Sequence, residues 1–392
     1  MKGLRGAIVA SALVAGALAV ANAPASPQAL TGGQGFKQVG SWGSAGEDNG
    51  QFGTTAGLAT DEAGRIFVAD SNNYRLQIFS KTGVFENAIT VGGLEHHFVP
   101  DVAVDPDGNA WGTTDTFDQA MSFTRDGQYL GSIVTPKQAM GLAADAQGNI
   151  YVGTYGDDIH RVMRYDKNDV GTTLTDSILV PGDVEVSPDG TIYVSDLSNP
   201  SALKVKRFNA NGDVLGTWNA GLSAPVGLGV DLDCNLWMTN IAERRLDRRT
   251  PSGKLIGTAA SPDLIAHDVV VGLKGDLYAF DGGTFKIIHF AENRAKPATA
   301  NIPGTLTAIR KTVKIVFTLN RVACPAEVGA TATLTGKGIA GRAVGLKLKV
   351  GMKNTIAMKL SKAASGKATF EIVLKTNGRP TKEVRKVTVV SK

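Results

Sequence analysis

Residues 57–79 read GLATDEAGRIFVADSNNYRLQIF, and this pattern determines the architecture of the chain. An apolar segment runs into an Asp-x-x-Gly turn at Asp61–Gly64, and an apolar segment with a central aromatic residue follows over Ile66–Val68. Glycine at the fourth position suits a type I turn that closes through a left-handed residue. The stretch therefore predicts two antiparallel strands joined by a tight turn.

The same turn recurs along the chain, always with an aromatic residue three positions later. Its fourth positions are Gly64, Gly108, Gly148, Gly190, Cys234 and Gly275, separated by 44, 40, 42, 44 and 41 residues. Most copies contain a second turn, as at Thr82-Gly83 and Asp126-Gly127, so each repeat should supply four strands. A repeat of this length with four strands is typical of a β-propeller blade. Copy five has Cys234 in place of glycine, so either Asn235 takes the left-handed conformation or the turn is strained.

Copy one carries the most specific resemblance in the chain. Gly50-Gln51-Phe52, followed by residues 57–61 and 66–79 with Asn73, Arg75 and Gln77, resembles a strong NHL repeat. The other copies keep the glycine turn and the aromatic strand but mostly lose the Asn-x-Arg-x-Gln segment. The resemblance covers roughly residues 36–293 and implies an all-β, six-bladed β-propeller of bacterial, secreted type. Residues 36–42 would then form the outer strand of the last blade and close the ring, which removes exposed sheet edges.

The first 25 residues have the pattern of an export signal. Lys2 and Arg5 precede an apolar run over Ala7–Val20, and small residues of A-x-A type follow. This predicts a secretory signal peptide over residues 1–25, cleaved after Ala21 or Ala25, with an uncleaved N-terminal anchor as the alternative. We expect a secreted, extracellular protein that can associate with the cell surface.

The C-terminal region differs in pattern and in charge. A linker is predicted over residues 294–304, and residues 305–392 contain six or seven short alternating segments that predict a small β-sandwich of immunoglobulin-like type. In outline this region resembles C-terminal modules of secreted actinobacterial proteins. Residues 297–392 hold 18 Lys and Arg against 3 Glu, a net charge of +15, whereas residues 1–296 carry 23 basic and 33 acidic residues.

The charge division leaves three interpretations open. The basic half could dock on the acidic propeller, which spans residues 26–293, or attach to an anionic wall or envelope polymer. Alternatively, lysines at alternate strand positions merely make the outer faces soluble.

One position of each repeat begins the strand that would line the axial channel. It reads Gly57, Asp101, Gly141, Asp183, Gly227 and Asp268. Three carboxylates would lie on alternate blades around one mouth of the channel, and Glu185 would point the same way as Asp183. Such a cluster suits Ca²⁺, Mg²⁺ or a cationic ligand, so Asp101, Asp183 and Asp268 are candidate metal ligands. The alternative is that these carboxylates accept backbone N–H bonds in the preceding loop.

The histidines offer a weaker metal hypothesis. NHL-type propellers include a zinc lyase with dispersed histidines, and His97, His160 and His267 could face the same mouth of the channel. The candidate ligand-binding set therefore adds His267 to the four carboxylates Asp101, Asp183, Glu185 and Asp268. None of the five histidines has a metal-binding spacing, so loop histidines without metal are the alternative. A second polar column, Asp70, Thr114, Thr154, Asp196, Asn240 and Asp281, should bond the next loop or an arginine such as Arg75.

No catalytic signature is present in the sequence: it lacks a G-x-S-x-G elbow, a phosphate loop and a dinucleotide fingerprint. Export would permit a bridge between Cys234 and Cys324, but we expect free or buried thiols. The sequence favours a non-enzymatic binding or scaffold module without a certain cofactor, with a metal-dependent lyase or lactone hydrolase as the alternative. We expect a monomer that binds a protein or carbohydrate ligand on the propeller face. We expect no nucleic-acid binding, because an acidic propeller repels the phosphate backbone.

Overall fold

The structure is a computed structural model. It describes residues 35–91, 98–114, 118–156, 159–199, 203–220, 227–231, 233–272 and 275–292, together with seven strands between Thr305 and Ser391. The chain divides into two units, of which one comprises residues 1–231 and 235–293 and the other residues 232–234 and 294–392. The predicted signal peptide (1–25) and linker (294–304) lie outside the described residues.

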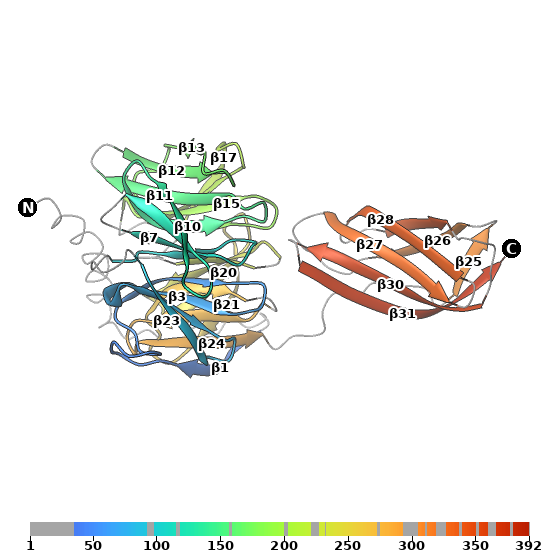
Figure 1. Ribbon diagram of the computed structural model, residues 1–392, viewed down its shortest axis with the longest axis horizontal. Coiled ribbons are helices and arrows are strands. Elements are labelled where there is room, and N and C mark those ends of the chain that lie inside the picture. Colours follow the sequence, from blue (N-terminus) through green and yellow to red (C-terminus); the bar gives the residue numbers. More distant parts are fainter. Residues whose placement is uncertain are drawn as a thin grey trace, which may run out of the picture. The chain divides into compact units, whose positions relative to one another are not determined.

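The first unit consists of six four-stranded antiparallel sheets, the blades of a β-propeller (Figure 1). Blade 1 contains β2 (Thr55–Thr60), β3 (Ile66–Asp70), the 3-10 turn η1 (Ser71–Asn73), β4 (Arg75–Phe79) and β5 (Phe85–Thr90). Blade 2 contains β6 (Val102–Val104), β7 (Ala110–Thr114), β8 (Gln119–Phe123) and β9 (Tyr129–Val134). Blade 3 contains β10 (Gln138–Ala144), β11 (Ile150–Gly156), β12 (Ile159–Tyr165) and β13 (Gly171–Thr175).

The remaining blades follow in the same order. Blade 4 contains β14 (Pro181–Val186), β15 (Ile192–Asp196), β16 (Lys204–Phe208) and β17 (Val214–Asn219). Blade 5 contains β18 (Leu228–Val230), β19 (Leu236–Asn240), β20 (Arg245–Arg249) and β21 (Leu255–Ala260). Blade 6 contains β22 (Ala266–Val271), β23 (Leu277–Asp281), β24 (Lys286–Glu292) and, as its outer strand, β1 (Phe36–Trp42).

The N-terminal strand closes the ring as predicted. β1 pairs antiparallel with β24, with Phe36 opposite Glu292 and Trp42 opposite Ile287. The sixth blade is therefore assembled from both ends of the propeller sequence. The first and last blades are joined by β1 and the connector of residues 43–54, which continues into β2.

The repeated turns adopt the predicted geometry. In copy one the N–H of Gly64 donates to the carbonyl of Asp61 at 3.0 Å, and Gly64 has a φ of +82°. Of the two alternatives for copy five, the structure shows the strained turn, because Cys234 itself takes the left-handed conformation, with a φ of +55°, and Asn235 does not. The second turn of copy three likewise has no glycine, and Asp169 adopts a φ of +61° there.

The aromatic residue of each repeat joins one blade to the next. Phe67 of blade 1 packs with Val102 and Phe123 of blade 2, and Tyr151 of blade 3 packs with Val184 and Ile192 of blade 4. These aromatic side chains are buried, as are the middle strands that carry them. Burial at the blade interfaces, and not within single sheets, therefore supplies the hydrophobic core of the ring.

The second unit is all-β. Its strands are β25 (Thr305–Ile309), β26 (Thr312–Thr318), β27 (Glu327–Gly336), β28 (Ile339–Lys349), β29 (Lys353–Lys359), β30 (Gly366–Thr376) and β31 (Arg379–Ser391). They are hydrogen-bonded in the order β28-β27-β30-β31-β25-β26-β29, with β25 and β31 parallel. The immunoglobulin-like sandwich stays a prediction. Among the described residues, no helix is long and apolar enough to cross a membrane.

Candidate functional site

The three axial aspartates lie where the inner strands of alternate blades begin, and each reaches the next blade. Asp101 of blade 2 accepts hydrogen bonds from the N–H of Val102 at 2.8 Å and from the N–H of Leu142, in blade 3, at 2.7 Å. Asp268 of blade 6 accepts from Val269 at 2.7 Å and from Leu58, in blade 1, at 2.6 Å.

Asp183 repeats this arrangement in blade 4. Its Oδ2 atom accepts from the N–H of Leu228, in blade 5, at 2.6 Å, and its carboxylate also accepts from the N–H of Val184. Three equivalent carboxylates therefore join blade 2 to blade 3, blade 4 to blade 5, and blade 6 to blade 1. The bonds run to the inner strand itself and to the next blade, not to the preceding loop that the sequence suggested.

The glycines that alternate with these aspartates leave space for them. A Cβ atom on Gly57 would overlap Oδ1 of Asp101, and one on Gly227 would overlap Oδ1 of Asp268. A Cβ atom on Gly141 would overlap the carbonyl oxygen of Gly182, next to Asp183. The alternation of glycine and aspartate in the sequence thus reflects close backbone approach at three blade interfaces.

The four carboxyl groups of this cluster have raised pKa values. Burial, followed by the negative charges of Asp183 and Asp101, raises the pKa of Asp268 well above its ordinary value. Burial and the charge of Asp183 do the same to Asp101, and burial and the charges of Asp183 and Asp268 raise the pKa of Glu185. The pKa of Asp183 rises to about 7, mainly because of burial. Asp101, Asp183, Asp268 and Glu185 therefore form one electrostatically coupled cluster.

The axial carboxyls are the candidate ligands for a divalent cation. They already accept backbone N–H groups, and their raised pKa values favour the neutral form, which binds a hard cation less strongly than a carboxylate does. Among the described residues, no group of three His, Cys, Asp or Glu is arranged to hold a metal ion. The candidate metal ligands Asp101, Asp183 and Asp268 therefore stay a prediction.

The described histidines lie in separate places. The ring of His160, on β12, is tilted against that of Tyr155 with ring centroids 5.0 Å apart, and the ring of His289, on β24, stacks on Tyr278 with centroids 4.5 Å apart. His267 precedes Asp268 but packs against Phe280 of its own blade, at 5.9 Å. His97 lies outside the described residues. The structure thus brings Asp101, Asp183, Asp268 and Glu185 together, whereas the rings of His160 and His267 pack within their own blades.

The polar column at the ends of the second strands is structural, as predicted. Asp70 forms an ion pair with Arg75 at 2.8 Å, and Asp196 forms one with Lys206 at 3.0 Å. Asp281 accepts hydrogen bonds from the N–H groups of Ile265 and Gly283 in the neighbouring loops.

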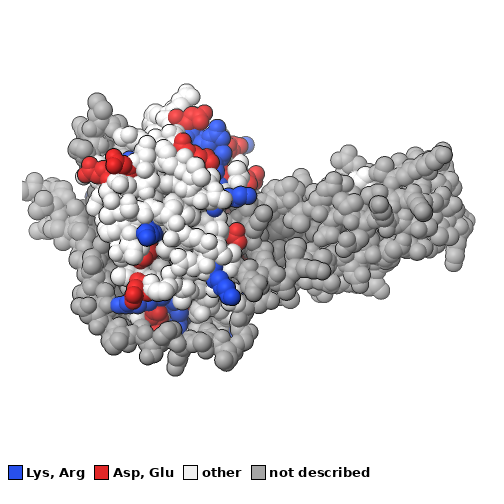
Figure 2. Space-filling model, turned by 90° about the horizontal axis from the view of Figure 1, so that it is seen from below, with Lys and Arg blue, Asp and Glu red and all other residues white. Residues whose placement is uncertain are grey.

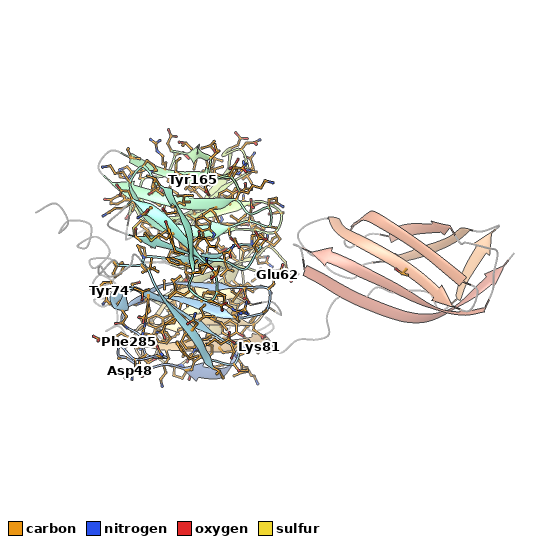
Figure 3. All side chains as sticks on the ribbon, viewed as in Figure 1. Asp48, Glu62, Tyr74, Lys81, Tyr165 and Phe285 are labelled. Carbon is orange, nitrogen blue, oxygen red and sulfur yellow. The ribbon has the colours of Figure 1, made fainter. Side chains whose placement is uncertain are left out.

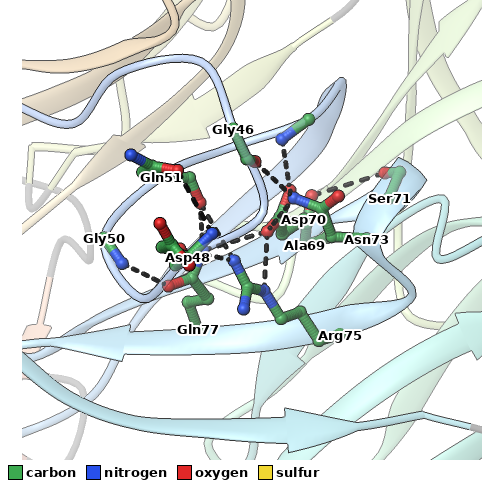
Figure 4. Close-up of polar contacts among 11 residues, drawn as sticks. Gly46, Asp48, Gly50, Gln51, Ala69, Asp70, Ser71, Asn73, Arg75 and Gln77 are labelled. Carbon is green, nitrogen blue, oxygen red and sulfur yellow. Dashed lines mark hydrogen bonds and ion pairs between the residues drawn. The ribbon is translucent and has the colours of Figure 1, made fainter.

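Blade 1 contains a polar network that the sequence analysis missed (Figure 4). Arg75 donates to the carbonyl oxygens of Asp48 and Gln51 at 2.9 and 3.1 Å, and Gln77 donates to that of Gln51 at 2.7 Å. Gln77 also accepts from the N–H of Gly50, and Asn73 donates to the carbonyl of Gly46. The Asn-x-Arg-x-Gln segment therefore binds the connector from β1 to β2. Copy one alone keeps this segment complete, and that difference was the sequence signal for the network.

The two faces of the propeller are formed by different loops. Figure 3 shows Asp48, Tyr74 and Phe285 on one side and Glu62 and Lys81 on the other. Tyr74 and Phe285 precede the third strands of blades 1 and 6, whereas Glu62 and Lys81 lie in the hairpin turns of blade 1. Figure 2 shows acidic and basic groups interspersed among uncharged residues on the side of the propeller in view.

Cys234 is disulfide-bonded and fully buried, so the expectation of a free thiol is wrong for this residue. The only other cysteine of the sequence, Cys324, lies outside the described residues.

Comparison with known proteins supports the fold. The NHL repeat family model matches residues 56–79. A streptogramin B lyase structure is similar with a TM-score of 0.50 at 14% identity, covering 66% of this chain and 98% of that chain. A gluconolactonase from Xanthomonas campestris gives a TM-score of 0.51 at 17% identity, covering 62% of this chain and 87% of the other.

A putative gluconolactonase structure gives a TM-score of 0.50 at 14% identity, with 68% of this chain and 94% of that chain covered. Identities this low show the fold alone, and they confirm the six-bladed propeller. No curated protein gives a significant match to the chain.

Proposed function

We propose that the protein is an exported, non-enzymatic binding protein. The propeller would serve as a rigid platform for a protein or carbohydrate ligand, and the basic C-terminal unit would attach it to an anionic envelope polymer. The observation that carries this proposal is the use of the axial carboxylates. Asp101, Asp183 and Asp268 each accept backbone N–H groups from two blades, which makes them part of the framework of the ring.

The platform role follows from how the ring is built. Neighbouring blades are fixed to one another by aromatic packing, by carboxylates that accept N–H groups of the next blade, and by the blade 1 network. The loops on either face are therefore held in defined positions. A preorganised surface loses little conformational entropy on binding. Localisation outside the cell rests on the export pattern of residues 1–25, and a monomeric state stays part of the proposal.

The test uses the full-length purified chain and two variants. Lactone hydrolysis and thermal unfolding are measured with and without Ca²⁺, Mg²⁺ and Zn²⁺ for wild type, Asp183→Asn and Asp126→Asn. Asp126 is the control because its side chain is exposed on a hairpin. We expect no turnover that depends on Asp183, and no saturable metal-induced shift in the unfolding temperature. Turnover that Asp183→Asn abolishes and Asp126→Asn retains would overturn the proposal.

A second candidate is a metal-dependent lyase or lactone hydrolase on the same fold. One observation favours it: burial raises the pKa of Asp183 to about 7, and the residue keeps some exposure to solvent. A carboxyl that titrates near neutral pH is suited to general acid–base catalysis. For a lactone hydrolase the assay above decides between the two candidates, and the thermal shift with metal ions tests the bound ion that a metal-dependent lyase would also require.

A further inference from the structure

The strand register of the C-terminal unit collects basic residues on one face of its sheet. In the β30–β31 pair, Lys375 lies opposite Pro380, Val373 opposite Lys382 and Thr369 opposite Lys386. Because directly paired residues share a face and alternate residues along a strand do so too, these positions lie on one side. Lys367, Lys375, Lys382 and Lys386 thus belong to the same face.

The neighbouring strands extend this face. Gly329 of β27 lies opposite both Lys375 of β30 and Lys347 of β28, and Thr333 lies opposite Arg342. Lys349 is two residues from Lys347 and lies opposite Glu327. Three more basic residues therefore join the face on β28: Arg342, Lys347 and Lys349.

The register on the other side of β31 gives the same result. Thr305 of β25 lies opposite Thr388, Ile309 lies opposite Thr312 of β26, and Thr312 lies opposite Lys359 of β29. This series places Lys314, Lys353 and Lys359 on the face as well. We call this side of strands β25–β31, with its ten Lys and Arg residues, the basic face. Because the end strands β28 and β29 also contact each other, this face curves round the unit.

The opposite side of the sheet has a different composition. On β30 it carries Phe370, Ile372 and Leu374, and on β27 it carries Val328 and Leu334. On β27 and β30 apolar positions therefore alternate with the positions of the other side, whereas β31 also carries Arg379, Glu383 and Arg385 on the side of Phe370.

The basic face carries more charge of one sign than solubility requires. Within the described strands, its only acidic residues are Glu327 and Glu371. Faces that serve solubility alone normally mix both signs, because a single-sign field repels itself. Threonines fill much of the remaining face, as at Thr331, Thr333 and Thr369, and they add hydroxyl donors for anionic oxygens.

We propose that the basic face binds an extended, phosphate-bearing polymer that has no bases. Along a strand, residues on one face recur about every 6.6 Å, and strands lie about 4.8 Å apart, so the face forms a two-dimensional array of cations. Such an array binds a linear polyanion through the release of counterions. The proposal deepens the envelope attachment in the proposed function and rests on it.

Two other polyanions fit the face less well. Single-stranded nucleic acids require aromatic residues for base stacking, and the register places Phe317 and Phe370 of the described strands on the opposite face. A membrane surface is normally held by apolar residues that insert between lipids, whereas the basic face is made mainly of Lys and Thr.

The test measures binding of long-chain inorganic polyphosphate to the full-length protein over a range of salt concentrations. One variant replaces Lys367, Lys375, Lys382 and Lys386 with Gln. The control replaces four exposed basic residues of the propeller with Gln: Lys81, Arg125, Lys167 and Lys204. We expect the affinity of the first variant for polyphosphate to fall at least about tenfold, and its salt dependence to become shallower by roughly three to four charges. The control should bind polyphosphate within twofold of wild type.

A footprint on the wild-type protein avoids any folding defect of the variant. Acetylation of lysines, read by mass spectrometry, should be slowed by polyphosphate at Lys375, Lys382 and Lys386 and unchanged at Lys81. Equal affinity losses in both four-residue variants would overturn the proposal, as would equal protection at all lysines. Tighter binding to single-stranded DNA or to phosphatidylglycerol vesicles than to polyphosphate would also overturn it. None of these results depends on whether the propeller is an enzyme.

Discussion

At the scale of single residues, the axial carboxyls couple the stability of the ring to pH. Asp101, Asp183, Asp268 and Glu185 all have raised pKa values in the folded chain, with Asp183 at about 7 against an ordinary value of 3.8. In the unfolded chain these protons leave near the ordinary values. Between the two ranges the folded chain binds more protons, so its free energy of unfolding falls as pH rises.

We therefore expect the unfolding temperature to be lower at pH 8 than at pH 5, by about 3 °C or more. Asp183→Asn should reduce this difference, because it removes a group that titrates and repels its neighbours. Asp126→Asn, whose parent side chain is exposed, should leave it unchanged. The measurement is thermal unfolding by circular dichroism. A wild-type unfolding temperature that rises from pH 5 to pH 8 would contradict the coupling.

Cys234 shows strain at a single backbone position. Five of the six equivalent turn positions are glycine, and Cys234 adopts their left-handed conformation with a φ of +55°. A residue with a Cβ atom pays about 1–2 kcal/mol there relative to glycine. We expect Cys234→Gly to be more stable than Cys234→Ser by about 1 kcal/mol, since both lose the disulfide and only one relieves the strain. Urea unfolding of the two variants gives the difference directly; equal midpoints would exclude strain at this turn.

At the scale of elements, the retained NHL segment explains how the closing strand is connected to the ring. Asn73, Arg75 and Gln77 bind carbonyl oxygens of the connector between β1 and β2, and Arg75 is fixed by its ion pair with Asp70. Blade 5 keeps an arginine at the equivalent position, Arg245, but it pairs with Asp247 of its own strand.

Arg75→Ala should therefore destabilise the protein by about 3 kcal/mol, because it leaves buried Asp70 without its cationic partner and frees two carbonyls. Lys204 holds the equivalent position in blade 4 and is exposed. Lys204→Ala should change stability by less than about 0.5 kcal/mol. Proteolysis within residues 43–53 should rise in Arg75→Ala only. Comparable losses in the two variants would show that the network does not hold the connector.

These elements also show how far the sequence could predict the structure. The Asp-x-x-Gly turns and the aromatic residue after each predicted the hairpins, since both signals are local. The partners of Arg75 and Gln77 are backbone carbonyls at Asp48 and Gln51, which have no side-chain signature. The alternation of Gly57 with Asp101 was visible, but the bond from Asp101 to Leu142 follows only once blades 2 and 3 are packed together.

At the scale of the whole molecule, a propeller is only as stable as its weakest blade interface. Five interfaces join blades that follow one another in sequence, whereas the interface between blades 6 and 1 includes a strand from the other end of the propeller sequence. The ring centroid of Trp42, on β1, lies 5.9 Å from that of Tyr278 and 6.3 Å from that of Phe79. The same ring packs under the turn glycine Gly83 of blade 1. It therefore joins blade 6 to blade 1 at the closure.

Trp218 provides a matched control within the same chain. It lies on the outer strand of blade 4 and packs in the same way under Gly253, the turn glycine of blade 5, beside Arg249. Replacing either tryptophan with alanine should cost about 3 kcal/mol of packing. The consequences should differ, because β17 lies in sequence between described strands of blades 4 and 5, whereas β1 is continuous with other described strands only through residues 43–54.

We therefore expect Trp42→Ala, and not Trp218→Ala, to accelerate amide hydrogen exchange along β24 (Lys286–Glu292) under native conditions, by tenfold or more. Trp218→Ala should instead lower the global unfolding temperature without selective exchange in blade 4. If β17 and β24 exchanged equally fast in their respective variants, the closing strand would have no special role. The ring would then open at any interface with the same probability.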